Sequence, residues 1–116
     1  MQIPKVFESE YRFCLIMWEN EPATCSELAV LCKRELGWSR TTTYTVIKRL
    51  EERGVLKKED SVVTSVYSKE EIQVSEMDEL IEKKFEGSIP AFIAAFAKSK
   101  KLSDKDRKEI LELLGE

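Results

Sequence analysis

Three short segments with helical spacing, followed by a change to alternating β-branched residues, constrain the fold of this chain more than any other feature. Ser9, Thr24 and Ser39 are residues favoured as helix caps, and each precedes apolar residues spaced at i, i+3, i+4 and i+7. Gly37 and Gly54 follow the second and third segments, where glycine commonly ends a helix. The sequence therefore predicts helices over residues 9–18, 24–35 and 40–53.

One side of each predicted helix carries the residues expected to form a core. With 42% hydrophobic residues, the chain is apolar enough to bury a modest core and too apolar to be disordered. The predicted inward-facing residues are Tyr11, Cys14, Leu15 and Trp18 in the first helix, Leu28, Leu31 and Cys32 in the second, and Thr43, Val46, Ile47 and Leu50 in the third.

After Gly54 the spacing changes. Residues 55–59 and 62–67 are rich in β-branched and aromatic side chains, and Asp60-Ser61 between them is suited to a turn, which predicts a β-hairpin. Three helices and then a hairpin is the element order of a winged helix-turn-helix. The expected fold class is mostly α with a small β-hairpin (α+β), followed by C-terminal dimerisation helices.

Helical spacing returns beyond the hairpin, at about residues 75–85, 88–97 and 103–114. Gly87 separates the first two of these helices, and Pro90 lies in the first turn of the second, where proline is tolerated. Charge sign and periodicity both change near residues 68–75. We therefore expect two domains: a winged-helix DNA-binding domain over residues 1–70 and a helical dimerisation domain over residues 71–116.

The C-terminal helices carry more apolar residues than short helices behind a separate core need. A second copy of the same helices would cover them in a two-fold homodimer, whereas the alternative is that they fold back onto their own domain. The residues expected in the dimer contact are Leu80, Ile81, Phe85, Ile89, Phe92, Ile93, Phe96, Ile110, Leu111 and Leu114.

The third helix has an unusual outward side. Four threonines lie between residues 41 and 45, and threonine has a poor helix propensity, so this surface is expected to serve a purpose other than solvation. Six cationic side chains and two carboxylates lie between Ser39 and Lys58, a local charge of +4 in a chain of net charge −3. Short hydroxyls, an aromatic ring and cations suit the base edges and phosphates of a DNA major groove. The expected DNA-binding residues of this helix are Arg40, Thr41, Thr42, Tyr44, Thr45, Lys48 and Arg49.

Lys57 and Lys58 lie on the first predicted strand of the hairpin. They are expected to contact DNA phosphates, although lysines on a strand can equally protect an exposed sheet edge. Glu59 and Asp60 at the tip are unfavourable near phosphates, so a short or weak contact is expected there.

Several runs of the sequence together resemble the penicillinase-repressor (BlaI/MecI/CopY-type) family of winged-helix transcriptional regulators. The resemblance covers nearly the whole chain and rests on Glu8-Ser9-Glu10, Ile16-Met17-Trp18, Trp38-Ser39, Thr42-Thr43-Tyr44-Thr45, Lys48-Arg49-Leu50, Gly54-Val55-Leu56, Phe85, Gly87-Ser88, Phe92 and Ala95-Phe96. It implies a homodimeric repressor that binds a double-stranded palindromic DNA operator and that a membrane sensor-protease often releases. By match of position, Thr41, Thr42, Tyr44, Thr45, Lys48 and Arg49 would face the operator.

The chain departs from the family pattern at three places. Arg40-Thr41 stands where many relatives have Pro-Lys, so the operator sequence cannot be carried over. Ala95-Phe96 stands where β-lactam-responsive members have a cleavable Asn-Phe bond. No cysteine follows Cys32, so the cysteine-rich metal motif of the copper-responsive branch is missing.

Other function classes find little support. The chain has no histidine, no glycine-rich phosphate loop and no nucleophile motif, so neither an enzyme nor a cofactor or metal site is expected. Cys14, Cys25 and Cys32 lack zinc-site spacing and are expected to be small buried residues, with a redox-sensing thiol as the alternative. No secretory signal and no membrane-length apolar run is visible, so a cytoplasmic protein without membrane insertion is expected. The alternative function is a winged-helix adaptor that binds protein and not DNA.

Overall fold

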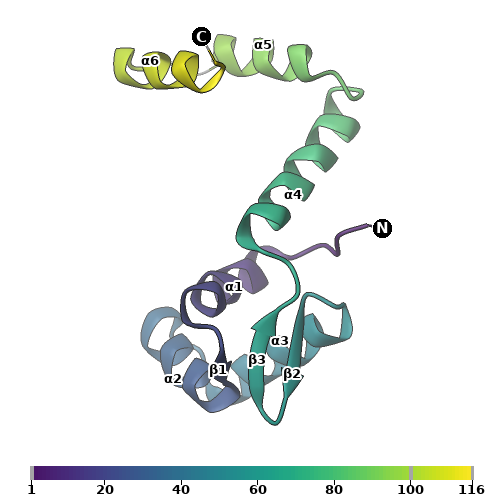
Figure 1. Ribbon diagram of the computed structural model, residues 1–116, viewed down its shortest axis with the longest axis vertical. Coiled ribbons are helices and arrows are strands. Elements are labelled where there is room, and N and C mark those ends of the chain that lie inside the picture. Colours follow the sequence, from purple (N-terminus) through teal and green to yellow (C-terminus); the bar gives the residue numbers. More distant parts are fainter. Residues whose placement is uncertain (1, 100, 116) are drawn as a thin grey trace. The chain divides into compact units, whose positions relative to one another are not determined.

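The computed structural model describes residues 2–99 and 101–115. The chain divides into two compact units, Met1–Glu76 and Met77–Glu116, each of which is described by itself. The elements in chain order are α1 (Glu8–Asn20), β1 (Ala23–Thr24), α2 (Cys25–Leu36), α3 (Arg40–Glu52), β2 (Leu56–Glu59), β3 (Val62–Ser65), α4 (Lys69–Lys84), α5 (Ile89–Ser99) and α6 (Asp104–Leu113) (Figure 1). This is the predicted mostly helical fold with a small antiparallel sheet.

The predicted ends of α2 and α3 are confirmed by their caps. The Thr24 hydroxyl accepts the Glu27 N–H at 3.0 Å, and the Glu27 carboxylate accepts the Thr24 N–H at 2.8 Å, which forms a capping box. Ser39 caps α3 by accepting the Thr42 N–H at 3.1 Å. Gly37 ends α2 with a φ of 72°, a left-handed conformation that glycine adopts without steric cost.

The core of the first unit lies between α1, α2, α3 and the hairpin. Phe13, Met17, Leu28 and Leu50 are fully buried at its centre. All four predicted inward residues of α3 are buried: Thr43, Val46, Ile47 and Leu50. Their burial fixes the rotation of α3 about its axis, and this rotation decides which side chains of the helix face solvent.

The predicted start and inward face of α1 are wrong by about one residue. The helix begins at Glu8 with Phe7 at the cap position, and its buried side consists of Glu10, Phe13, Cys14, Ile16 and Met17. Tyr11, Leu15 and Trp18 are only half-buried. Tyr11 and Trp18 pack edge to face with 5.7 Å between ring centroids, and the Trp18 indole N–H donates to the Tyr67 carbonyl at 3.0 Å. Large aromatic rings with a polar group therefore border the core instead of filling it.

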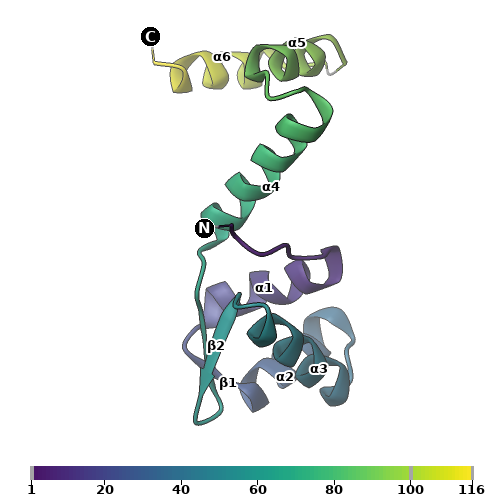
Figure 2. The same cartoon turned by 90° about the vertical axis from the view of Figure 1, so that its right-hand side faces the viewer.

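The predicted hairpin is confirmed. β2 and β3 pair antiparallel from Leu56 opposite Ser65 to Glu59 opposite Val62. The turn residues Asp60 and Ser61 both have positive φ, at 50° and 65°, as a two-residue hairpin turn requires. Figures 1 and 2 show the hairpin alongside α3.

The sheet has a third strand that the sequence did not predict. The two residues of β1 pair with β3, so the strand order is β1-β3-β2. Immediately after β1, the Cys25 N–H donates to the Ser61 carbonyl at 2.9 Å. The turn of the hairpin is thereby joined to the first residue of α2.

The predicted start of α4 near Ser75 is also wrong. The Ser68 hydroxyl accepts the Glu71 N–H at 3.0 Å and the Glu71 carboxylate accepts the Ser68 N–H at 2.8 Å, so a capping box starts the helix at Lys69. Ile72 is 1% exposed and belongs to the core of the first unit. The division between the units therefore falls inside α4.

The second unit consists of the end of α4 together with α5 and α6. Phe85 and Phe92 pack edge to face with 5.4 Å between ring centroids. Ser88 accepts the Ala91 N–H at the start of α5, and Ser103 accepts the Asp106 N–H at the start of α6. Within the described residues, none of the helices combines the length and apolar character needed to cross a bilayer.

Candidate nucleic-acid interface

The outward surface of α3 is an open, polar and cationic face. Its members are exposed because the residues at positions 43, 46, 47 and 50 are turned into the core. The seven predicted DNA-binding residues of this helix all lie on it, namely Arg40, Thr41, Thr42, Tyr44, Thr45, Lys48 and Arg49. We call these seven residues the α3 outer face.

The hydroxyls of the α3 outer face are not equally free. The Thr42 hydroxyl lies 2.9 Å from the hydroxyl of the capping Ser39, so it is already engaged at the start of the helix. Thr41 and Thr45 lie one helical turn apart and are both exposed. These two side chains offer a methyl group and a hydroxyl each, which suit contacts with thymine methyls and base edges.

Arg40 and Tyr44 form a pair on the α3 outer face. The Arg40 Nη2 donates to the Tyr44 hydroxyl at 2.8 Å, and the guanidinium carbon lies 5.1 Å from the centroid of the Tyr44 ring. The same Nη2 lies 3.4 Å from the hydroxyl of Ser26 in the first turn of α2. The guanidinium is therefore held in place by two helices, and sequence spacing gave no sign of the part played by Ser26.

Lys57 and Lys58, the predicted phosphate contacts of the hairpin, are both exposed on β2. The Lys58 ammonium lies 3.9 Å from a carboxylate oxygen of Glu51 on α3, and the two side chains are 40% and 37% exposed. Such a surface pair is weak and leaves the ammonium available to another anion. Glu59 and Asp60 are exposed at the tip, so the hairpin carries both charge signs.

Arg53 contributes less to the cationic surface than the sequence suggested. Its guanidinium forms an ion pair with Glu10 of α1, and the Glu10 side chain is only 7% exposed. Glu10 also accepts the Phe7 N–H at 2.9 Å, and the Phe7 ring lies beside the Arg53 guanidinium. Among the described residues, the buried Arg53 Nε has no hydrogen-bond partner. The pair joins α1 to the end of α3, and sequence spacing gave no sign of it.

The three cysteines lie in the core of the first unit as free thiols. Burial, assisted by the nearby Glu10 carboxylate, raises the pKa of Cys14 to about 12. Burial also raises the pKa of Cys32. A neutral, covered thiol is unreactive, which disfavours a redox-sensing role for Cys14 and Cys32. No cluster of histidine, cysteine or carboxylate side chains able to hold a metal ion occurs among the residues that the structure describes.

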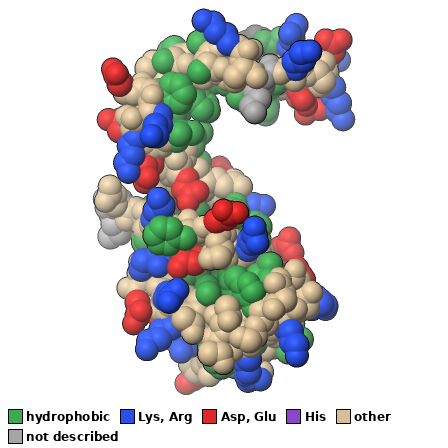
Figure 3. All heavy atoms as spheres, turned by 180° about the vertical axis from the view of Figure 1, so that it is seen from behind, with side chains coloured by type: hydrophobic (Ala, Val, Ile, Leu, Met, Phe, Trp, Pro, Cys, Tyr) green, Lys and Arg blue, Asp and Glu red, His purple; other side chains and the backbone are tan. Residues whose placement is uncertain are grey.

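The residues predicted for the dimer contact divide into two groups. Ile81 is buried within its own chain, and Phe85 and Phe92 are half-buried against each other. The other seven are exposed: Leu80, Ile89, Ile93, Phe96, Ile110, Leu111 and Leu114. Figure 3 shows apolar side chains exposed on the second unit. We call these seven residues the apolar tail surface.

Comparisons with known proteins extend over both units. A family model described as penicillinase repressor matches residues 7–116. The chain is also 23% identical over 115 residues to the methicillin resistance regulatory protein MecI of Staphylococcus aureus, and the alignment covers 96% of this chain and 94% of that protein.

Proposed function

The chain belongs to the penicillinase repressor family, and on that premise we propose that it represses transcription by binding a palindromic DNA operator as a homodimer. The observation that carries the proposal is the α3 outer face, where hydroxyls, a phenol and three cations are exposed on one short helix. Because the family is one of transcriptional regulators, we expect no catalytic activity.

In this proposal α3 lies in the major groove, which is wide enough to admit a helix. Thr41 and Thr45 contact base edges and thymine methyls, while Lys48 and Arg49 contact phosphates on either side. The hydrogen bond from the Thr42 N–H to the Ser39 hydroxyl holds the first turn of α3 in helical form, although threonine itself favours it little.

The hairpin acts as the wing in this proposal. Lys57 and Lys58 approach a neighbouring phosphate, and the Glu51 contact of Lys58 is exchanged for that phosphate. Glu59 and Asp60 repel the DNA backbone at the tip, so we expect the wing to add modest affinity and little sequence preference.

Dimerisation accounts for the apolar tail surface. Ile93, Leu111 and Leu114 are 54%, 60% and 77% exposed in the single chain, and water contact with so many large apolar side chains is unfavourable. A second copy of the same helices would cover them through a two-fold contact, and two-fold symmetry would present two α3 helices to a palindromic site.

The proposal is tested by selecting DNA from a random duplex library with the full chain, followed by a salt titration on the enriched sequence. We expect an inverted repeat and a loss of affinity of about a thousandfold or more between 50 and 200 mM salt, because each phosphate contact releases counterions. A chain that enriches no sequence at the lower salt concentration would contradict DNA reading and favour the adaptor function. Sedimentation at the same concentrations would reveal a monomer if the tail covers its own domain.

We further propose a membrane sensor-protease as the partner that releases the repressor from DNA. The Ala95-Phe96 bond lies within α5, and both side chains are exposed. A helix must open locally before a protease can bind its backbone in extended form, so cleavage there would require local unfolding of α5. Mass spectrometry of the chain after co-expression with such a protease tests this: a fragment ending at Ala95 supports cleavage at this bond, and an intact chain contradicts it.

A further inference from the structure

We infer that Arg40 determines specificity by reading a guanine in each operator half-site, with Tyr44 as its positioning residue. This inference rests on the proposed function and names a base contact for it.

Arg40 lies at the N-terminal end of α3, and this is the end at which the recognition helix of helix-turn-helix proteins contacts bases. It is the first residue of α3, and the N-terminal residues of a recognition helix are those that contact base edges. Its side chain extends along the helix to Tyr44, one turn further on, where Nη2 and the phenol oxygen are 2.8 Å apart. The guanidinium is therefore held against the surface of α3 and is not extended freely into solvent.

Two contacts besides the hydrogen bond to the Tyr44 hydroxyl hold the guanidinium in place. The Tyr44 ring lies 5.1 Å from the guanidinium carbon and supports it from one side. Ser26 of α2 approaches the same nitrogen, Nη2, at 3.4 Å, near the upper limit for a hydrogen bond. The Ser26 contact is thus the weaker of the two, and it is the one that a base would displace. Its loss would free one Nη2 proton. Together with an Nη1 proton it would form a fork, a pair of donors able to bind two neighbouring acceptors.

Guanine is the base that matches such a fork. It presents two acceptors, O6 and N7, side by side in the major groove, and arginine donates to both at once. A free arginine loses rotamer freedom when it forms this contact, whereas Arg40 has already lost much of it to Tyr44.

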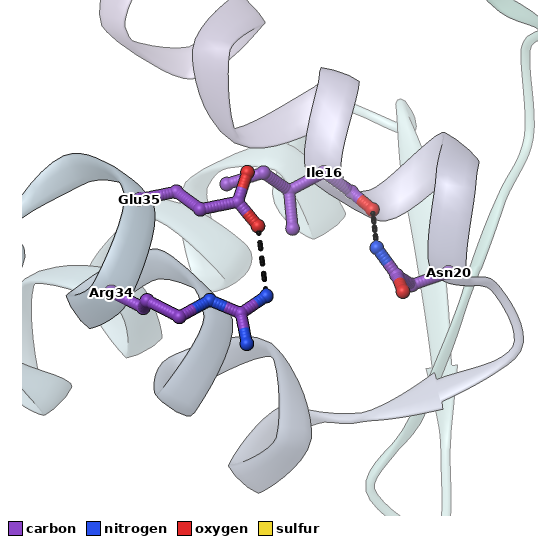
Figure 4. A network of polar contacts seen from close by, with 4 residues as sticks. All are labelled: Ile16, Asn20, Arg34 and Glu35. Carbon is purple, nitrogen blue, oxygen red and sulfur yellow. Dashed lines mark hydrogen bonds and ion pairs between the residues drawn. The ribbon is translucent and has the colours of Figure 1, made fainter.

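The experiment measures the affinity of the full chain for every single-base variant of the selected half-site. The chain is compared with Arg40→Lys, Arg40→Ala and Tyr44→Phe. Arg34→Ala serves as the matched control, because Arg34 is also an exposed arginine of the first unit, and it pairs with Glu35 on α2 at 3.3 Å (Figure 4).

At one guanine in each half-site, both Arg40 variants should lose about tenfold or more of the discrimination between bases. Arg40→Lys keeps the charge, so its affinity for unrelated DNA should stay close to that of the unaltered chain. Tyr44→Phe keeps the ring but loses the hydroxyl, so it should lower discrimination at the same guanine by a smaller factor. Arg34→Ala should leave the whole profile unchanged.

Three results would overturn the inference. An equal loss of affinity for all sequences with Arg40→Ala would make Arg40 a phosphate contact, although the repressor function would stand. A loss of discrimination at a different base pair with Tyr44→Phe would remove its positioning role. If the unaltered chain selects no motif, the proposed function itself fails, and the guanine contact fails with it.

Discussion

The ion pair between Glu10 and Arg53 should destabilise the first unit unequally when either partner is changed. Arg53→Met keeps an apolar stem against Phe7 but leaves the Glu10 carboxylate, 7% exposed, without its cation. Removing one partner of a buried pair leaves an uncompensated buried charge, and here only the Phe7 N–H continues to stabilise it. We expect Arg53→Met to lower the free energy of unfolding by about 3 kcal/mol.

The reverse change should cost much less. Glu10→Gln leaves Arg53, whose side chain is 32% exposed and can still reach water. The Gln amide oxygen can also accept from both the Phe7 N–H and the guanidinium. Because the ion pair becomes a hydrogen bond from a cation to a neutral amide, and the bond from the Phe7 N–H loses its charged acceptor, we expect a loss of about 1 kcal/mol. The two substitutions should therefore differ by about 2 kcal/mol, which is the difference between about 3 and about 1.

Urea unfolding followed by tryptophan fluorescence measures both variants, since Trp18 borders the core of this unit. All chains are compared at one concentration, because dimer formation would shift apparent stability. Arg12→Met is the control, since Arg12 and Glu8 form a pair that is 62% and 87% exposed and contributes little. Equal losses for Arg53→Met and Glu10→Gln, or a loss for Arg53→Met no larger than that of Arg12→Met, would refute the reasoning.

Three further predictions concern DNA, assembly and thiol chemistry. Lys48→Ala should weaken operator binding by about 1 kcal/mol or more without unfolding the domain, and a gel-shift assay with unchanged affinity would remove Lys48 from the interface. Ile93→Asp should produce monomers in sedimentation, because Ile93 is 54% exposed in the single chain and its replacement would bury an unpaired charge only in a dimer. A variant that still sediments as a dimer would place the contact elsewhere. Cys14, with a pKa near 12, should stay almost fully protonated below pH 9, so a thiol reagent should modify the folded chain far more slowly than the urea-unfolded chain. Equal modification rates in the two states would contradict its burial.

The sequence predicted α3 correctly because independent local signals agreed there. Ser39 set the start, the spacing from Thr43 to Leu50 set the buried side, and Gly54 marked the stop. Because the buried side of α3 could be predicted, the remaining side chains of the helix could be assigned to the α3 outer face. The pairing of Arg40 with Tyr44 could be suspected from their spacing of four, but the contact with Ser26 required the packing of α2 against α3.

The errors occurred where local patterns were ambiguous or absent. In α1, helical spacing fits the set containing Tyr11 and Trp18 as well as the set containing Phe13 and Met17, and only the packing partners decide between them. The start of α4 is a polar run after Ser68 that apolar spacing does not indicate as a helix, although Ser68 and Glu71 have capping-box spacing. Glu10 and Arg53 are 43 residues apart, so no local pattern could join them.

The hydrogen bond from the Cys25 N–H to the Ser61 carbonyl means that the wing is not a free arm. A loop that must be immobilised on arrival at a surface loses conformational freedom at that moment, and its affinity falls accordingly. Here the tip is already immobilised when the domain folds, so docking need not restrict it again. Lengthening the turn by a few glycines would detach the tip from α2 and lower the affinity of the proposed complex with DNA, even with every lysine in place.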